Sequence, residues 1–395
     1  MRGRVCKYEG KRGDNYYIVY DLPRDPVTGE RRQKKVSGFR TKREAEAELA
    51  RLVNQSVAGD YIEPQTLTIG EYLDSWLESY GRTNLAPSTY ESYQNIINNH
   101  LRVKIGNIPL QKLQPVHLQV YYSKALAGGR ADNKKSLGTS LSPTTVLFHH
   151  RVIREALHHA VRLGLVDRNV ADAAIPPRKA HNEMQVLPEE EIQKFLGLFK
   201  GSYLYMPVYL ALMTGMRAGE ILALTWQNVD LKNGIINVKQ SLRQRKVGRP
   251  EFQRPKTKGS RRAVEISPMV IKVLKEHKVM QAKEKLASTG YKSFNLICAK
   301  PDGGPINPGS MSGRFYKTTR RAGISLRFHD LRHCHATYLL KAGVNPKIVS
   351  ERLGHSSVRQ TLDIYSHVIP GMQREAALGL EERLFGAEKK LLAFD

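Results

Sequence analysis

Two polar segments that contain proline divide this chain and limit how it can fold. One covers residues 60–68 around Pro64, and the other covers residues 168–183 around Pro176 and Pro177. A proline disfavours helical backbone in the residue before it, so a helix is not expected to continue through either segment. The length of 395 residues suits two or three domains. The sequence therefore predicts three domains, over residues 1–60, 66–168 and 184–388.

The N-terminal segment combines strand patterns with positive charge. Tyr16–Tyr20 and Gln33–Phe39 have the residue types of β-strands. Thr41 and Glu44 have the spacing of a capping box, which predicts that a helix follows. Residues 31–43 contain seven lysines or arginines and no acidic residue. They could form a solvated charged surface, but a short sheet that presents basic residues to a DNA groove is the favoured interpretation.

The middle segment is predicted to be helical. Apolar residues recur at helical spacing from Ile69 to Leu77, and further helices are expected to start near Pro87, Pro115 and Pro143. Trp76 and the tyrosines of this segment are expected in the core, the alternative being platforms for base stacking. The last helix carries two histidine pairs that are expected at the surface or against the backbone, His149-His150 and His158-His159.

The C-terminal segment mixes helices with a short sheet. Helices are predicted to follow Leu187 and to cover Tyr205–Thr214. Asn233-Gly234 is a hairpin-type turn signal before a strand at Ile235–Val238, and Ala263–Ile266 is its expected partner. The rest of the segment is predicted to be mostly helical. The expected fold class is therefore multidomain and mainly α with small β-sheets, that is, α+β.

The charge of the chain indicates a polyanionic partner. Lysine and arginine number 63 against 37 aspartates and glutamates, which gives a formal net charge of +26. Cys6, Cys298 and Cys334 have no paired spacing, which favours a reducing compartment and argues against a structural zinc site. The sequence has no apolar run of membrane-spanning length and no signal-peptide pattern at its start. We expect an intracellular protein with no membrane partner.

Residues suited to phosphate chemistry lie in the C-terminal segment. Arg217 follows a Thr-Gly pair, and Arg332 lies about one helical turn after His329. An arginine presents a planar fork of donors that fits two phosphate oxygens, so two arginines can hold a scissile phosphate and stabilise its transition state. His355 and Tyr365 follow. A tyrosine hydroxyl, with an ordinary pKa of roughly 10, becomes a better nucleophile where nearby cations favour the phenolate.

Each of these residues also has a simpler explanation. Arg217 could be a surface arginine, and Tyr365 could pack in a core. His329, His333 and His335 could suggest a metal cluster, but no carboxylate or cysteine completes a ligand set. The combination in this order is much more specific than any one residue.

A basic segment between the two predicted strands contains a candidate general acid. From Lys239 to Arg262 there are ten basic residues and one acidic residue, Glu251. The segment could be a flexible loop that only grips a DNA backbone. Alternatively, a lysine in it could protonate a leaving oxygen, because surrounding arginines lower the pKa of an ammonium group. Lys256 and Lys258 are both candidates.

Together these motifs resemble the tyrosine recombinase (phage integrase) family. The residues that carry the likeness are Thr214-Gly-Met-Arg217-Ala-Gly-Glu220, Pro255-Lys256-Thr257, His329-Asp-Leu-Arg332-His333, Leu353-Gly-His355 and Tyr365. The likeness extends over nearly the whole chain. In its layout the chain is similar to integrases of conjugative transposons and temperate phages. It implies a small three-stranded arm-type DNA-binding domain, a helical SAM-like core-binding domain, and a mixed α/β catalytic domain in the three predicted segments.

The resemblance implies a site-specific recombinase that cuts and rejoins DNA through a 3′-phosphotyrosyl intermediate, without metal, cofactor or ATP. Tyr365 would be the nucleophile. The scissile phosphate would be held by Arg217, Arg332 and His355. Lys256 matches the family's lysine before threonine and would protonate the leaving oxygen, although Lys258 is only two residues away. His329 would assist proton transfer at the tyrosine.

The resemblance also implies partners and a location. Four protomers would act together on double-stranded DNA, at core and arm attachment sites, in the cytoplasm of a bacterium near its nucleoid. A DNA-bending or excision factor could assist. A helix over residues 370–385, with Ala376, Ala377, Leu378, Leu380 and Leu384 on its apolar face, would dock on a neighbouring protomer or fold back on its own domain. Two alternatives stay open, a type IB topoisomerase-like enzyme and a DNA-binding protein without catalytic activity.

Overall fold

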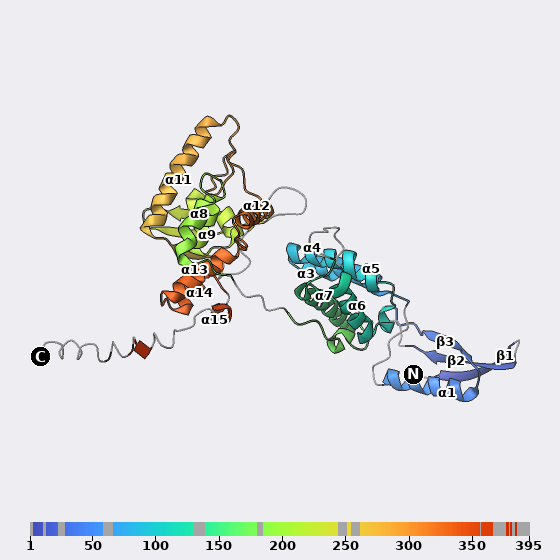
Figure 1. The fold of residues 1–395 in the computed structure, drawn as a ribbon. Coiled ribbons are helices and arrows are strands. Elements are labelled where there is room, and N and C mark those ends of the chain that lie inside the picture. The colour runs from blue at the N-terminus through green and yellow to red at the C-terminus, as the bar shows by residue number, and fades with distance from the viewer. Residues whose placement is uncertain are drawn as a thin grey trace. The chain divides into compact units, whose positions relative to one another are not determined.

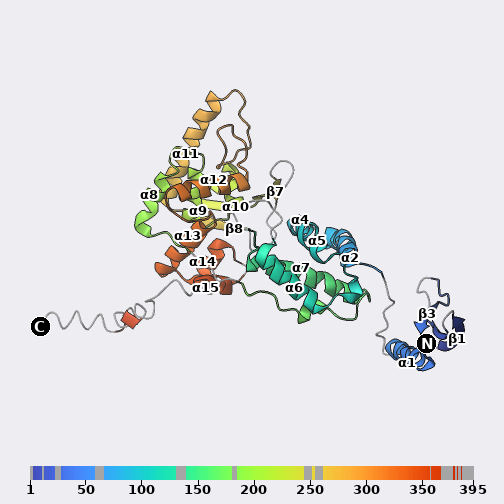
Figure 2. The ribbon, with the colours of Figure 1, turned by 45° about the vertical axis from the view of Figure 1, so that its right-hand side comes forward.

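The structure is a computed structural model that divides into two compact units, Met1–His181 and Asn182–Asp395. The described residues are 3–10, 13–22, 28–57, 66–129, 139–179, 185–243, 251–253, 261–355, 357–365, 377, 378, 380 and 384. Figures 1 and 2 show helices throughout the chain and small sheets near the N-terminus and in the second unit. The predicted fold class, mainly α with small β-sheets, is confirmed.

The N-terminal sheet has three antiparallel strands in the order β1-β2-β3, followed by one helix. The elements are β1 (Gly3–Gly10), β2 (Gly13–Asp21), β3 (Gln33–Phe39) and α1 (Lys42–Val57). The residue patterns predicted β2 and β3, whereas β1 was expected only from the family resemblance. The capping box is present, since Glu44 N–H donates to Thr41 Oγ1 over 3.2 Å and Thr41 N–H donates to Glu44 Oε2 over 3.3 Å. One face of the sheet packs through Ile18 and Tyr20 on α1.

The helices of the middle segment surround one apolar core. They are α2 (Ile69–Trp76), α3 (Arg82–Asn84), α4 (Pro87–Ile96), α5 (Arg102–Ile105), α6 (Pro115–Gly128) and α7 (Pro143–Arg162), with π-helical turns at Leu77–Gly81 and Ile97–Leu101. The three predicted proline starts are confirmed. Trp76, Tyr72 and Tyr93 are buried in this core, as expected. Packing continues to Ala174, which lies within the segment predicted as a linker.

The prediction for one histidine pair was wrong. His149 and His150 are only 1% and 8% exposed, and they bond side chains of α6 rather than solvent or backbone. The Tyr121 hydroxyl lies 2.7 Å from Nδ1 of His149, and the Tyr122 hydroxyl lies 2.8 Å from Nδ1 of His150. Each buried hydroxyl thereby gains a partner that offsets its desolvation.

The second unit begins with α8 (Ile192–Gly197), α9 (Tyr205–Thr214) and α10 (Ala218–Leu222). A three-stranded antiparallel sheet follows in the order β4-β5-β8, from β4 (Val229–Asp230), β5 (Ile235–Val238) and β8 (Arg262–Glu265). The predicted pairing is confirmed, with Ile236 opposite Val264. The basic segment between β5 and β8 also forms β6 (Ser241–Arg243) and β7 (Glu251–Gln253), which the sequence analysis did not predict.

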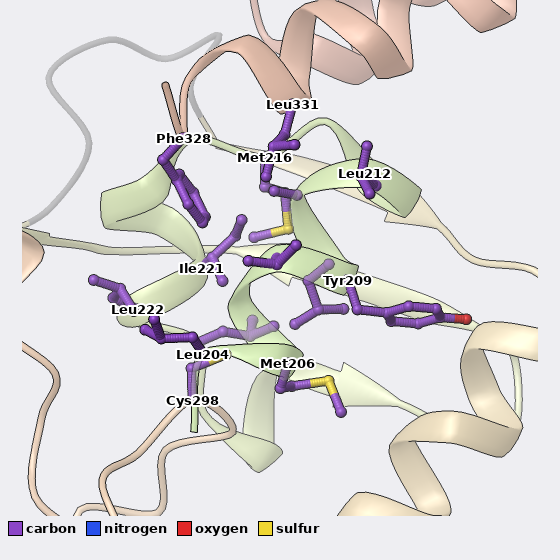
Figure 3. Close-up of a cluster of buried hydrophobic side chains, with 14 of the residues drawn as sticks. Leu204, Met206, Tyr209, Leu212, Met216, Ile221, Leu222, Cys298, Phe328 and Leu331 are labelled. Atoms are coloured by element: carbon purple, nitrogen blue, oxygen red, sulfur yellow. The ribbon is translucent and has the colours of Figure 1, made fainter. Parts of the chain in front are cut away.

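The remaining helices complete this unit. They are α11 (Pro268–Ala287), α12 (Pro308–Arg321), α13 (Asp330–Lys341), α14 (Pro346–Leu353) and α15 (Val358–Tyr365). Figure 3 shows Met216, Ile221, Phe328 and Leu331 pointing into one buried cluster. These residues lie near Arg217 and Arg332 in the sequence. Their burial in the apolar core therefore anchors the backbone segments that carry the two arginines. Across the described ranges, no helix is both long and apolar enough to span a bilayer.

Candidate active site

A glycine with left-handed backbone conformation positions Arg217. Helix α9 ends at Gly215, which has a φ of 64°. A Cβ atom at Gly215 would lie 2.6 Å from both Cδ2 of His335 and Cδ2 of Leu353, so both the conformation and the space require glycine. The turn brings Arg217 to the N-cap of α10, as the sequence predicted.

The carboxylate of Glu220 and a backbone carbonyl fix the Arg217 side chain. Glu220 Oε2 accepts from the Arg217 N–H over 2.9 Å, and its Oε1 accepts from Nη1 over 2.9 Å. Arg217 Nη2 donates to the carbonyl of Gly354 over 3.0 Å. The Arg217 side chain is still 38% exposed, so an anion can approach a guanidinium whose orientation is already set.

Arg332 is held by a backbone carbonyl of this same turn. It lies on the first turn of α13, is 3% exposed, and donates from Nη1 to the Gly215 carbonyl over 2.8 Å. The carbonyl that holds Arg332 therefore lies two residues before Arg217. This short connection links the two arginines, which are far apart in the sequence.

His355 lies beside both arginines. It follows Gly354, whose φ of 68° ends α14, and its Nδ1 lies 2.8 Å from Oγ1 of Thr361. Burial, Arg332 and Arg217 together lower the pKa of His355 to about 4. The imidazole is thus neutral near pH 7, and the positive charge at this place comes from the arginines.

Two more histidines border this group. The rings of His329 and His333 lie 5.1 Å apart, nearly perpendicular to each other. Burial and then Arg332 lower the pKa of His329, while burial and then His329 lower the pKa of His333 to about 4. The charge of Arg332 contributes to the lowered pKa of both histidines. The structure therefore brings together Arg217, His329, Arg332 and His355 of the predicted site.

Two predicted site residues are not placed in the same detail. Lys256, like the alternative Lys258, lies outside the described residues. Tyr365 is the last residue of α15, but its side chain also lies outside the described part of the structure. The predicted tail helix over residues 370–385 falls largely outside it as well. The roles proposed for these residues stay predictions.

A second layer of buried charge was missed by the sequence analysis. Arg262 donates from Nη1 and Nη2 to the two oxygens of Glu220, over 3.2 and 2.9 Å. Burial alone would raise the pKa of the Glu220 carboxyl, but hydrogen bonds from Arg262 and Arg217 outweigh burial and lower it. One signal was available in the sequence: Glu220 is the only charged residue in the run 218–224.

His335 belongs to this layer. Its Nδ1 lies 2.7 Å from the Leu212 carbonyl, and its Nε2 accepts from Nε of Arg352 over 3.0 Å. These partners fix a neutral ring with its proton on Nδ1. Within the residues that the structure describes, no group of three or more histidine, cysteine, aspartate or glutamate side chains could hold a metal ion.

Comparisons with known proteins identify the family. Residues 185–371 match the phage integrase family, residues 68–126 match the N-terminal SAM-like domain of phage integrases, and residues 5–56 match an arm DNA-binding domain. The chain belongs to the phage integrase family, whose members are tyrosine recombinases.

Two relatives match over nearly their whole length. A tyrosine recombinase XerC-like protein of Caldanaerobacter subterraneus is 29% identical, covering 94% of this chain and 97% of the relative. The ICEBs1 integrase of Bacillus subtilis is 27% identical, covering 93% and 97%.

Solved structures share the fold. The Tn1549 transposon integrase in complex with a circular intermediate DNA has a TM-score of 0.65 at 20% identity, covering 80% of this chain and 99% of that one. A lambda integrase dimer bound to a COC′ core site has a TM-score of 0.57 at 19% identity, covering 92% and 96%.

Because several of its histidines are buried, we expect the protein to lose stability in mild acid. His335 has a pKa of about 4 in the folded chain because of burial and then Arg352, whereas an exposed histidine has a pKa of about 6.5. Between these values the unfolded chain binds a proton that the folded chain does not, so stability falls as the pH falls. Thermal melting should show this fall between about pH 6.5 and 4.

The substitution His335→Gln should make the fall shallower, even if the variant melts earlier at neutral pH. The control is His158→Gln, which changes an exposed histidine of the other unit. Equal slopes for His335→Gln and the unaltered protein would show that His335 does not contribute.

Proposed function

We propose that this chain is an integrase that cuts and rejoins DNA at specific sites through a tyrosine–DNA intermediate, and that it integrates and excises a mobile element. The observation that carries the proposal is the convergence of Arg217, Arg332 and His355. Two permanent cations and a neutral hydrogen-bonding ring suit the extra charge of a phosphodiester under attack. Arginine also matches the planar spread of phosphate oxygens.

The proposed first step exchanges one phosphoester for another. The Tyr365 oxygen forms a bond to phosphorus, the bond from phosphorus to the 5′-oxygen breaks, and the 3′-phosphate stays on the tyrosine. Position 365 lies one helical turn after Thr361, the residue that contacts His355, which supports its nearness to the phosphate site. His329 takes up the tyrosine proton. It can accept this proton because its lowered pKa leaves the imidazole neutral.

The second step reverses the first with a new strand. A 5′-hydroxyl from the partner DNA gives its proton to Lys256 and attacks the phosphotyrosine. The new phosphodiester forms as the bond from phosphorus to the tyrosine breaks, and the tyrosine takes its proton back from His329. The number of phosphoester bonds is unchanged throughout, so no external energy source is needed.

Lys256 gives a proton to the departing 5′-oxygen in the first step. When Nδ1 of His355 accepts from the Thr361 hydroxyl, its Nε2–H can donate to a phosphate oxygen.

The N-terminal sheet is proposed to bind arm-type DNA with the face that does not pack on α1. Tyr17 lies on this face, with Lys35 4.0 Å above its ring and Tyr8 at 5.9 Å between ring centroids. An aromatic and basic sheet surface suits a DNA groove and its phosphates. Comparing the affinity of the full chain with that of a chain lacking residues 1–57, on DNA with and without arm sequences, tests this role.

A homotetramer on DNA is proposed on the strength of one structural neighbour. A lambda integrase tetramer bound to a Holliday junction has a TM-score of 0.53 to this chain at 20% identity. The topoisomerase alternative is not favoured, because the full-length relatives are named as recombinases and integrases. Formation of a junction between two sites separates the two activities, since a topoisomerase relaxes one duplex without exchanging strands.

The proposed nucleophile can be tested with a nicked core-site substrate that traps the covalent intermediate. Tyr365→Phe should bind this DNA normally and form no covalent complex, because only the nucleophilic oxygen is lost. Tyr316→Phe is the matched control, since it removes the hydroxyl of an exposed tyrosine on α12, and it should form the complex normally. Covalent product from Tyr365→Phe would reject this assignment.

The proposed general acid can be tested with a substrate whose 5′-oxygen is replaced by sulfur. A thiolate leaves without a proton, so Lys256→Ala should cleave the sulfur substrate well and the ordinary substrate poorly. Lys258→Ala should cleave both normally. If Lys258→Ala is the variant that sulfur rescues, the acid is Lys258, and rescue of neither would place the acid elsewhere.

A further inference from the structure

We infer that Arg262 is a positioning residue that keeps the positive charge of Arg217 available to the scissile phosphate. This inference rests on the function proposed above. Arg262 belongs to a strongly basic segment, yet its side chain is only 7% exposed. Its charge is therefore directed into the protein and not toward a DNA surface.

Arg262 binds Glu220 through a two-pronged contact. Nη1 and Nη2 reach Oε1 and Oε2, over 3.2 and 2.9 Å, which is the geometry of a strong arginine–carboxylate pair. Glu220 also accepts from Nη1 of Arg217 over 2.9 Å. One carboxylate is thus shared by two guanidinium groups, one of them buried and the other partly exposed.

The charges of this trio explain why both arginines matter. Glu220 and Arg217 alone sum to zero, so a carboxylate paired only with Arg217 would cancel the charge that the phosphate requires. With Arg262 present, the trio carries a net charge of +1. Arg262 satisfies Glu220, and Arg217 can then bind the phosphate without leaving a buried carboxylate unpaired.

Arg262 also fixes the backbone that holds Arg217 from its other side. Its Nε donates to the Arg352 carbonyl over 2.6 Å. Its guanidinium packs against Gly354, where an added Cβ would lie 3.0 Å from Nη1. Gly354 is the residue whose carbonyl accepts from Arg217 Nη2, and His355 follows it. Arg262 therefore holds Arg217 through the carboxylate of Glu220 and through the end of α14.

A purely structural ion pair would account for the burial but not for the shared carboxylate. The two roles predict different results in a nicked-substrate assay. If Arg262 only stabilises the fold, its loss lowers the melting temperature and leaves the cleavage rate of folded protein unchanged. If it positions Arg217, its loss slows cleavage in folded protein that still binds DNA.

The first test measures single-turnover covalent cleavage, DNA affinity and melting temperature in the full chain. Arg262→Met should slow cleavage by about tenfold or more, a smaller loss than the ~10²–10³ of a direct donor, with DNA affinity nearly unchanged. Arg262→Lys keeps the charge without the fork and should recover part of the rate. Lys292→Met removes an exposed ion pair with Asp302 in the same unit and should leave the rate unchanged.

The second test removes the carboxylate charge. In a Glu220→Gln background Arg217 has no carboxylate to neutralise it, so adding Arg262→Met should slow cleavage much less than it does in the unaltered protein. A methylphosphonate at the scissile position, which lacks one negative charge, should likewise shrink the Arg262→Met defect. If Arg262→Met alone folds poorly, the double variant still tests the inference, because it leaves no buried carboxylate unpaired and should cleave at nearly the rate of Glu220→Gln alone.

Three results would overturn the inference: normal cleavage by folded Arg262→Met, a defect of equal size in the Glu220→Gln background, or a defect that the methylphosphonate leaves unchanged. Failure of the unaltered protein to form any covalent complex with the nicked core site would instead reject the proposed function. The two failures are therefore distinguishable.

Discussion

The site depends on one buried carboxylate. Glu220 is 4% exposed and accepts hydrogen bonds from Arg217 and Arg262, so elements that are distant in the sequence meet at its two oxygens. A buried charge is costly unless it is paired and hydrogen-bonded, and here the pairing also orients the groups that would act on DNA. The apolar cluster of the second unit includes Met216 and Leu331, the residues that directly precede Arg217 and Arg332.

The positive charge of the chain is divided between two tasks. The formal net charge of +26 suits non-specific attraction to the phosphates of DNA. The arginines of the site are held by specific backbone and carboxylate partners and suit the chemical step. Burial and neighbouring charges lower the pKa of His333 and His355 to about 4, so these two imidazoles are neutral at neutral pH.

Local signals in the sequence predicted a large part of this structure. Proline starts and the Thr41 capping box are set by neighbouring residues, and both were confirmed. The pairing of the strand that follows Asn233-Gly234 with the strand near Val264 was confirmed as well. The arginines and His355 were found because their motifs resemble those of a family. Side-chain contacts between distant segments were missed, since Arg262 and Glu220 are 42 residues apart and no periodicity links them. The Tyr121–His149 pair was missed because it depends on the register of two helices.

The central claim is that Arg217 and Arg332 bind the same phosphate. A crystal structure of the protein on core-site DNA, with vanadate in place of the scissile phosphate, tests it most directly. We expect both guanidinium groups and His355 to lie within hydrogen-bonding distance of oxygens on one vanadate. A vanadate bound by only one of these arginines, or held at a different place on the protein, would contradict it.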